Sequence, residues 1–230
     1  MDFQSIIEHT ECERVYDSGL SQVYWIDEQY ILKVGEGATE NAVKNMNIVK
    51  DIMPVPNIIK HGEKYTLMQY VEGDNLEVIW DDIDNKAKSI VENQLYAMVQ
   101  KMRSLKCNKI GPLREIMNDA NVEIPCCDNL NDFIRYRADL RNLHFELEET
   151  YHLENVMSHN DLYPRNIIVG KDMTILAILD WEFSGFCPYY YEYKRRNVIK
   201  DYVEVDWDYM FKDYQHIPHE IDAIENKILF

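Results

Sequence analysis

The sequence predicts an α+β protein whose first third is rich in strands and whose remainder is mostly helical. Up to residue 70, short runs of β-branched and aromatic residues alternate with turn-forming residues. From Asn75 to Tyr151, apolar residues recur instead at three- and four-residue steps, which is typical of helices. A polar loop near residue 160 lies between short apolar runs. With 230 residues, 46% of them hydrophobic, the chain can bury a substantial core, as one compact two-lobed unit or as two small domains.

The first third predicts strands around one helix. The expected strands are at residues 14–16, 22–25, 30–34, 57–61 and 64–70. A helix is expected from Thr39, because Val43, Met46 and Val49 recur on one face. Pro54 ends it, since proline cannot continue a helix.

The middle of the chain predicts two helices that flank an irregular segment. An apolar stripe from Ala87 to Leu105 is more typical of a core helix than of a ligand site. Residues 106–128 carry two prolines, a glycine and adjacent cysteines, so a loop-rich insertion is expected there. Apolar spacing predicts a further helix over residues 133–151.

A loop at residues 158–166 carries the side chains that point to chemistry. It contains His159, Asp161 and Asn166, and a hairpin beyond it would bring Asp180, at the end of the next apolar run, close to the loop. One carboxylate can accept the proton of an attacking hydroxyl, while an Asn oxygen and a second carboxylate can hold Mg²⁺. Loop Asp and Asn residues most often only cap turns. Their combination here favours phosphoryl transfer, with Asp161 as the base and with Asn166 and Asp180 as the metal ligands.

His159-Asn160-Asp161 with Asn166, followed by Ile178-Leu179-Asp180-Trp181-Glu182, resembles the aminoglycoside phosphotransferase and choline kinase family. The resemblance implies a protein-kinase-like two-lobed fold that uses ATP and Mg²⁺ to phosphorylate a hydroxyl group of a small molecule. It also implies an ATP-clamping lobe at residues 1–70 and a catalytic and substrate lobe at residues 71–230. Protein kinases usually have Arg after the His, and Asp-Phe-Gly where this chain has Asp180-Trp181-Glu182, so the small-molecule branch is favoured. Residues 181–193 resemble a fungal-type subgroup.

The family pattern implies phosphate-binding residues in the first third. The turn with Ser18 and Gly19 would cover the phosphates, although it has a single glycine where a Gly-rich loop is usual. Lys33 would contact the α- and β-phosphates and pair with a helix glutamate. We expect Glu40 as that partner, because it precedes Val43 by three residues and so shares its inward face. An ordinary hairpin turn and a lysine that reaches solvent are the alternatives.

The adenine would meet the segment after the fifth strand. On the family pattern Met68 lines the back of the pocket, while Gln69 and Val71 offer main-chain hydrogen bonds. An ordinary edge strand explains the same residues. His159 is expected to brace the catalytic loop and not to act as a base.

Composition excludes several partners. A net charge of −17 argues against nucleic acid, because binding phosphate backbones requires a cationic face. No apolar run approaches the roughly 18 residues of a membrane span. The N-terminus does not resemble a signal peptide, and the five cysteines form no metal-binding or redox spacing, so a cytoplasmic protein with reduced thiols is expected. The sequence does not indicate an oligomeric state.

The acceptor is expected to be a hydroxyl-bearing small molecule. Residues 201–225 contain eight carboxylates opposed by Lys212 alone. The aromatic residues near them are Tyr189, Tyr190, Tyr191, Tyr193, Tyr202, Trp207, Tyr209 and Tyr214. Aromatic faces with carboxylates suit an ammonium-bearing alcohol, such as an amino alcohol or amino sugar. Amphipathic helices with a solvated acidic face explain the same residues.

Three other functions fit part of the pattern. A catalytically silent nucleotide-binding or scaffolding module would explain the single-glycine turn. A small protein kinase would share the catalytic residues but usually carries Asp-Phe-Gly. A metal hydrolase using His159, Asp161 and Asp180 would leave Lys33 without a role and lacks a second histidine cluster.

Overall fold

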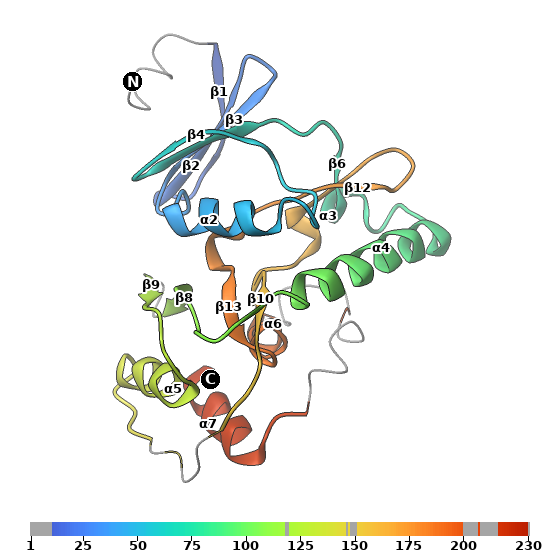
Figure 1. Cartoon of the computed structure of the whole chain (residues 1–230). Coiled ribbons are helices and arrows are strands. Elements are labelled where there is room, and N and C mark those ends of the chain that lie inside the picture. The colour runs from blue at the N-terminus through green and yellow to red at the C-terminus, as the bar shows by residue number, and fades with distance from the viewer. Residues whose placement is uncertain are drawn as a thin grey trace. The chain divides into compact units, whose positions relative to one another are not determined.

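The computed structural model describes residues 11–117, 120–145, 147, 151–199, 207 and 216–229. They form two compact units, which are described separately (Figure 1). Unit 1 takes its described residues from 1–94 and 164–182, and unit 2 from 95–163 and 183–230. Within these described ranges, no helix combines the length and the apolar character needed to span a bilayer. The expected lobes at 1–70 and 71–230 divide the chain by role, and that division stays a prediction.

Unit 1 contains a five-stranded antiparallel sheet in the order β1-β2-β3-β5-β4. Its strands are β1 (Cys12–Asp17), β2 (Ser21–Ile26), β3 (Tyr30–Gly35), β4 (Ile58–Gly62) and β5 (Tyr65–Gln69). Lys33 lies opposite Val23 on β2 and Thr66 on β5, so it occupies the middle of the central strand. All five strands expected from the sequence are confirmed.

Helix α2 (Glu40–Val49) packs beside β4 (Figure 1). The hydroxyl of Thr39 accepts the Ala42 N–H at 3.0 Å and so caps the helix, as the sequence predicts for its start. Val43, Met46 and Val49 are buried along one face. The sheet has its own core around Ile26, Leu32 and Val34, because these side chains share the covered face of β2 and β3.

A second, smaller sheet in unit 1 has the order β12-β11-β6. Its strands are β6 (Asp74–Asn75), β11 (Ile167–Val169) and β12 (Ile175–Ile178). A short helix, α3 (Leu76–Ile79), and a single 3₁₀ turn, η1 (Pro164–Asn166), lie next to it. The Asn75 side chain donates to the Arg165 carbonyl at 2.8 Å, which ties the start of α3 to η1.

Helix α4 (Asn85–Arg103) carries the chain from unit 1 into unit 2. Its fully buried stripe is formed by Val91, Leu95, Val99 and Met102. This stripe confirms a core helix, although Ile90, which was expected on it, is 38% exposed.

Unit 2 holds a three-stranded sheet and a separate antiparallel strand pair. The sheet has the order β13-β10-β7 and consists of β7 (Lys106–Cys107), β10 (Asn155–Ser158) and β13 (Gly185–Pro188). The pair is β8 (Leu113–Met117) with β9 (Ala120–Ile124). Strands β7, β8 and β9 occupy the segment expected to be loop-rich, so that expectation was wrong. Its prolines, Pro112 and Pro125, lie just before β8 and just after β9.

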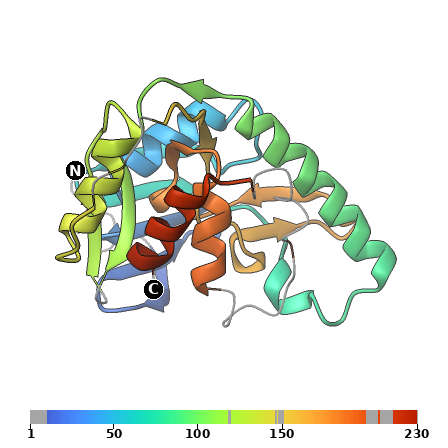
Figure 2. The same ribbon diagram turned by 90° about the horizontal axis from the view of Figure 1, so that it is seen from below.

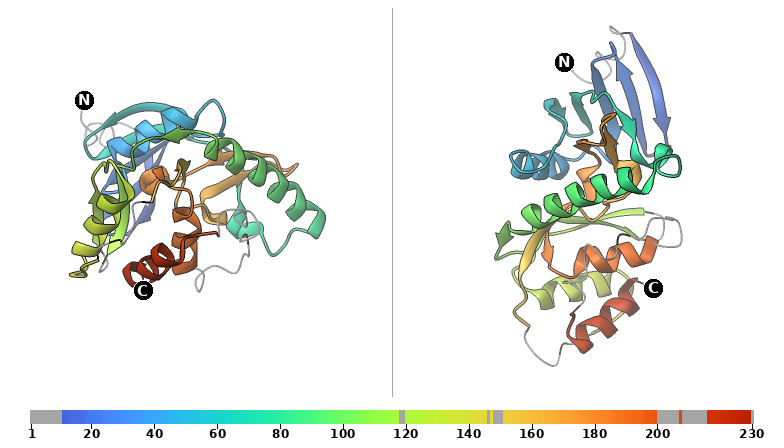
Figure 3. Two further views of the ribbon diagram at one scale, coloured as in Figure 1. Left: turned by 60° about the horizontal axis from the view of Figure 1, so that its bottom comes forward. Right: turned by 90° about the vertical axis from the view of Figure 1, so that its right-hand side faces the viewer.

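Three helices complete unit 2: α5 (Leu130–Asp139), α6 (Tyr191–Ile199) and α7 (His219–Leu229). Helices α6 and α7 lie side by side in Figure 2, and α5 and α7 do so in Figure 3. Their apolar faces form one core that includes Phe133, Tyr190 and Ile224. The expected helix over 133–151 is therefore confirmed only for its first part, because α5 ends at Asp139 and turns follow.

Candidate active site

The hairpin of β11 and β12 brings Asn166 and Asp180 together in unit 1. Asn166 ends η1 directly before β11, and Asp180 comes two residues after β12. The Leu179 N–H donates to the Asn166 carbonyl at 2.8 Å, which confirms the expected proximity for the Asn166 end of the loop, while the proximity of Asp161 stays a prediction. Asp180 has a φ of 61°, a left-handed conformation that Asp tolerates better than most residues. The residue is therefore held in an uncommon backbone state at a predicted ligand position.

Lys33 reaches the same place from the five-stranded sheet. Its Nζ lies 2.5 Å from Oδ1 of Asp180 and 3.9 Å from Oε1 of Glu182. Lys33 and Asp180 are 147 positions apart in the chain, and the lysine side chain is only 17% exposed. The alternative of a lysine directed to solvent is therefore wrong. A cation is held between two carboxylates.

Gly37 closes this cluster from the loop that follows β3. A Cβ at residue 37 would lie 2.5 Å from Cε and 2.7 Å from Nζ of Lys33, and 2.9 Å from Oε2 of Glu182. The Gly37 N–H donates to the Ser21 hydroxyl at 2.9 Å, which fixes the loop against the start of β2. The lysine and the glutamate thus occupy the space that any side chain at residue 37 would need.

Glu40 does not pair with Lys33, which corrects the sequence expectation. Its carboxylate lies 3.0 Å from Nζ of Lys44, one helical turn ahead, and its side chain is 68% exposed. Glu40 is the first residue of α2, whereas the buried face of the helix starts at Ala42. Glu40 precedes Val43 by three residues, but its side chain is directed to solvent. There it pairs with Lys44, four residues further along the helix.

The turn between β1 and β2 uses its polar groups internally. Gly19 has a φ of 80°, and its N–H donates to the Asp17 carboxylate at 2.8 Å. The Ser18 hydroxyl accepts the Ser21 N–H at 3.0 Å. The Gly19 N–H thus already binds an anionic oxygen within the turn, and the assignment of Ser18 and Gly19 to phosphate stays a prediction beside the alternative of an ordinary hairpin turn.

The three adenine candidates lie at the end of β5 and just beyond it. Met68 is partly buried and pairs across the sheet with Ile31 and Ile58. The Gln69 N–H donates to the Asn57 carbonyl at 2.9 Å, so this group is used within the sheet. Val71 comes two residues after the strand and belongs to no helix or strand. The assignment of these residues to adenine stays a prediction.

The donor set at Asp180 and Asn166 suits Mg²⁺. A carboxylate and an amide supply oxygen atoms, the ligands this hard cation prefers, and Mg²⁺ usually takes only one or two protein groups besides water and phosphate. Among the described residues, no three or more His, Cys, Asp and Glu side chains converge to hold a metal ion by themselves. The residues therefore fit a metal that arrives with a phosphorylated substrate better than a permanent structural ion.

The catalytic loop with Asp161 belongs to unit 2 and is buried. Asp161 is 7% exposed, and its N–H donates to Nδ1 of His159 at 3.2 Å. The imidazole therefore accepts a backbone hydrogen bond, as expected for a brace of the loop. Asn160 has a φ of 64°, and its side chain donates to the Phe183 carbonyl at 3.0 Å. These contacts fix the backbone on the N-terminal side of Asp161.

Glu192 on α6 supports this loop and was missed in the sequence. It is fully buried, and its Oε1 accepts the N–H groups of His159 at 3.1 Å and Asn160 at 3.0 Å. Its Oε2 lies 3.5 Å from NH1 of Arg103, whose side chain is 2% exposed. The sequence signal for Glu192 is its place as the single acid among the tyrosines at residues 189–193. An acid in such an apolar stretch is expected to be buried, and a buried acid needs a polar partner.

Two consecutive arginines of α6 also face the loop region. Arg196 donates to the Leu162 carbonyl at 3.0 Å, and its guanidinium lies 5.3 Å from the centre of the Tyr163 ring. Arg195 lies 5.1 Å from the centre of the Phe183 ring. Burial works to lower the pKa of Arg195, but the charges around it, including that of Asp161, raise the pKa above its usual value. Two buried cations of α6 thus lie near the loop that carries Asp161.

A fully buried ionic network joins the helices of unit 2. Arg137 on α5 lies 2.6 Å from Glu115 on β8 and 2.7 Å from Glu225 on α7. The hydroxyls of Tyr190 and Tyr191 donate to Glu225 and Glu115 respectively. Tyr190, Tyr191 and Glu225 are therefore part of the core, which corrects their assignment to an acceptor surface.

Among the other acceptor candidates, Trp207 is 1% exposed and is likewise buried. Tyr189 is partly buried, and its hydroxyl donates to the His216 carbonyl. Tyr202, Tyr209 and Tyr214, with most of the acidic stretch 201–225, lie outside the described residues.

The comparisons with known proteins agree on a family and a fold. The model of the phosphotransferase enzyme family (APH) matches residues 13–193. No curated protein matches the chain significantly. Among solved structures, the chain is similar to the streptomycin–ATP–APH(2")-IIa ternary complex, with a TM-score of 0.61 and 13% identity over 98% of this chain and 83% of that one.

A second similar structure is a thermostable mutant of aminoglycoside phosphotransferase APH(4)-Ia in ternary complex with AMP-PNP and hygromycin B. Its TM-score is 0.68 at 14% identity, over 98% of this chain and 87% of that one. ADP-bound APH(2")-Ib gives a TM-score of 0.58 at 12% identity, over 97% and 85%. These likenesses confirm the α+β, protein-kinase-like fold that the sequence predicts.

Proposed function

Because the chain belongs to the phosphotransferase enzyme family, we propose that it transfers the γ-phosphate of ATP to a hydroxyl group of a small molecule. The observation that carries the proposal is the contact of Lys33 Nζ with Asp180 Oδ1 at 2.5 Å, beside Asn166. Strand β3 and the β11–β12 hairpin are distant in sequence, yet they deliver a lysine, a carboxylate and an amide to one place. Those are the groups that a bound Mg·ATP needs.

Each of the candidate site residues has its own proposed role. Lys33 binds the α- and β-phosphates, and Ser18 and Gly19 cover them once the Gly19 N–H exchanges the Asp17 carboxylate for phosphate oxygen. Residues 1–70 form the ATP lobe, and Met68, Gln69 and Val71, at its end and directly after it, meet adenine. Asp180 and Asn166 hold Mg²⁺, which when bound offsets the charge that develops on the phosphates.

Asp161, in the lobe formed by residues 71–230, accepts the proton of the acceptor hydroxyl as that oxygen attacks the γ-phosphate. A buried carboxylate serves as a base only if its backbone is fixed, because a displacement of about 1 Å can cost about 100-fold in rate. The His159 contact at 3.2 Å and the Glu192 contacts supply that constraint.

The acceptor is proposed to be a cationic alcohol. Two structures of similar fold contain streptomycin or hygromycin B, and the net charge of −17 favours attraction of a cation. Since Tyr190, Tyr191 and Trp207 are buried, recognition of the ammonium group falls to other acidic or aromatic side chains.

The test begins with ATP binding, measured by calorimetry with and without Mg²⁺. Asp180→Asn should weaken Mg·ATP binding about tenfold or more, which corresponds to a loss of about 1.4 kcal/mol. Asp172→Asn is the matched control, because Asp172 is exposed in the turn of the same hairpin and its carboxylate accepts hydrogen bonds from the N–H and hydroxyl of Thr174. If both variants bind like the wild type, the nucleotide site is misplaced.

Acceptors are then screened by ADP release, with amino alcohols, amino sugars, neutral sugars and peptides compared. Turnover of the amines alone supports the cationic acceptor, and turnover of neutral alcohols alone refutes it. Turnover of peptides alone identifies a small protein kinase. Binding of Mg·ATP without turnover of any acceptor favours the silent module.

A further inference from the structure

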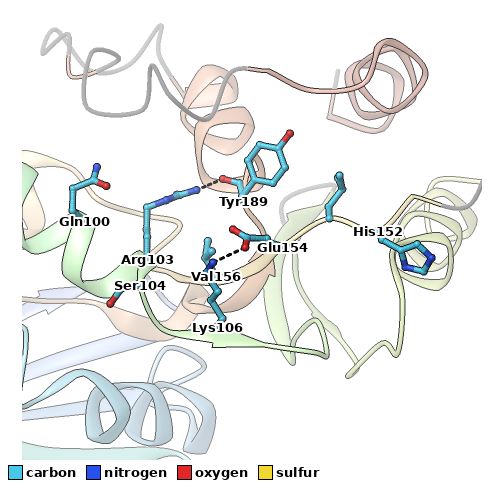
Figure 4. Close-up of a pocket in the computed structure, with 9 residues that line it drawn as sticks. Gln100, Arg103, Ser104, Lys106, His152, Glu154, Val156 and Tyr189 are labelled. Atoms are coloured by element: carbon cyan, nitrogen blue, oxygen red, sulfur yellow. Dashed lines mark hydrogen bonds and ion pairs between the residues drawn. The ribbon is translucent and has the colours of Figure 1, made fainter.

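A cavity of about 640 Å³ opens in unit 2 (Figure 4). Its lining includes Arg103, Lys106, His152, Glu154, Val156 and Tyr189. None of these residues is a candidate base, metal ligand or nucleotide contact. The volume lies within the range that holds small organic molecules, which is about 300–1,000 Å³. The cavity is therefore large enough for a ligand of its own.

Basic side chains gather around this cavity in an otherwise acidic protein. The chain has 41 acidic residues against 24 Lys and Arg, yet the lining pairs Arg103, Lys106 and His152 with one carboxylate, that of Glu154. Arg103 is buried at 3% exposure, whereas Lys106, His152 and Glu154 are exposed. Arg103, which pairs with Glu192 at the buried part, and Lys106 at the rim are both cationic donors, and a pair of such donors suits an anionic occupant.

The rim carboxylate is an exchangeable partner. Lys106 contacts Glu154 at 2.5 Å, but the two side chains are 55% and 65% exposed. An ion pair as exposed as this contributes little to stability, because both charges are already solvated and screened. A ligand oxyanion can therefore replace Glu154 beside Lys106 at little cost.

The wall of the cavity supplies an apolar contact. Tyr189 is partly buried, and because its hydroxyl donates to the His216 carbonyl its ring is held in place. Val156, on β10, is buried beside the Lys106–Glu154 pair in Figure 4. A ring or short aliphatic body can lie against these side chains while its charged end meets the cations.

We propose that this cavity binds a small organic oxyanion, a carboxylate or a phosphate monoester, through Lys106 and Arg103, with its apolar body against Tyr189. Arg103 also pairs with Glu192, which accepts backbone N–H groups of the loop that carries Asp161. The occupant would therefore bind a residue that directly contacts Glu192. The site is distinct in its residues from the proposed nucleotide and metal site, and its existence does not depend on phosphotransfer.

The test is ¹⁹F NMR line broadening with the whole chain, without nucleotide. The probes are 4-fluorobenzoate, 4-fluorophenyl phosphate and the uncharged 4-fluorobenzyl alcohol. Lys106→Gln should weaken oxyanion binding about fivefold, as expected for one partly exposed charge pair. Glu154→Gln should strengthen it by a similar factor, because Lys106 then lacks its competing partner.

Lys109→Gln is the matched control. Lys109 is 61% exposed and pairs with Asp128 at 2.8 Å, much as Lys106 pairs with Glu154, but it does not line the cavity. It should leave binding unchanged. A stronger response to benzoate or to the phosphate ester identifies which oxyanion the cavity prefers. Equal binding of the alcohol, equal effects at Lys106 and Lys109, or no binding at millimolar concentration would overturn the proposal.

Discussion

Glu192→Gln removes one buried charge while keeping the shape of the side chain. Glu192 accepts two backbone N–H groups of the catalytic loop and faces Arg103 at 3.5 Å. A hydrogen bond to a charged acceptor contributes about 1.5–3 kcal/mol, against about 1 kcal/mol for a neutral one. Leaving a buried partner charge uncompensated costs about 3–5 kcal/mol. Since the terms overlap, we expect the free energy of unfolding to fall by about 3–5 kcal/mol.

Urea unfolding followed by circular dichroism measures that loss, and turnover should fall about 100-fold if the loop shifts. Glu154→Gln is the matched control, because it makes the same chemical change at an exposed pair and should cost under about 1 kcal/mol. The double variant with Arg103→Gln should be more stable than the sum of the single losses predicts, since the two charges then disappear together. Equal stabilities for Glu192→Gln and its control would refute the reasoning.

Three further outcomes are expected. Asp161→Asn should abolish turnover yet leave Mg·ATP affinity intact by calorimetry, and retained turnover would remove Asp161 as the base. Burial alone would raise the pKa of Glu115, but the positive charges of Arg137, Arg195 and Arg141 hold that pKa below the usual 4.5. A group whose pKa is lower in the folded than in the unfolded state adds stability at high pH, and this stability is lost as the pH falls. The urea midpoint of the wild type should therefore decrease more steeply than that of Glu115→Gln when the pH is lowered below about 4.5. Burial raises the pKa of Cys187 to about 12, whereas Cys107 is exposed; mass mapping at pH 8 should find alkylation at Cys107 in the folded protein and at Cys187 only after unfolding.

Local patterns predicted the strands of the first third and the hairpin that carries Asp180. They worked because alternating apolar residues and turn residues act over a few positions. The resemblance to the family selected Lys33, whose contact with Asp180 spans 147 positions and comes from tertiary packing, while its role at the phosphates stays a prediction.

The failures have different physical causes. Glu40 was placed inward by helical spacing, but its side chain pairs with Lys44 in solvent. Glu192 lies in a helix, and its partners come from α4 and the loop of Asp161, so no nearby residue reveals them. Strands β8 and β9 pair with each other between prolines that suggested a loop. Of the three, only the role of Glu192 depends on long-range pairing of buried polar groups, which sequence spacing does not contain.

The steric fit at Gly37 limits how this protein can vary. Residue 37 bears no charge, donates no side-chain hydrogen bond and would escape any search for reactive groups. Nevertheless, the smallest added methyl group would displace Lys33, Glu182 or the loop itself. In a library of random substitutions, a replacement at residue 37 should be tolerated only where the flexible ends of Lys33 and Glu182 can move away from their present positions, so residue 37 affects the site without carrying a reactive group.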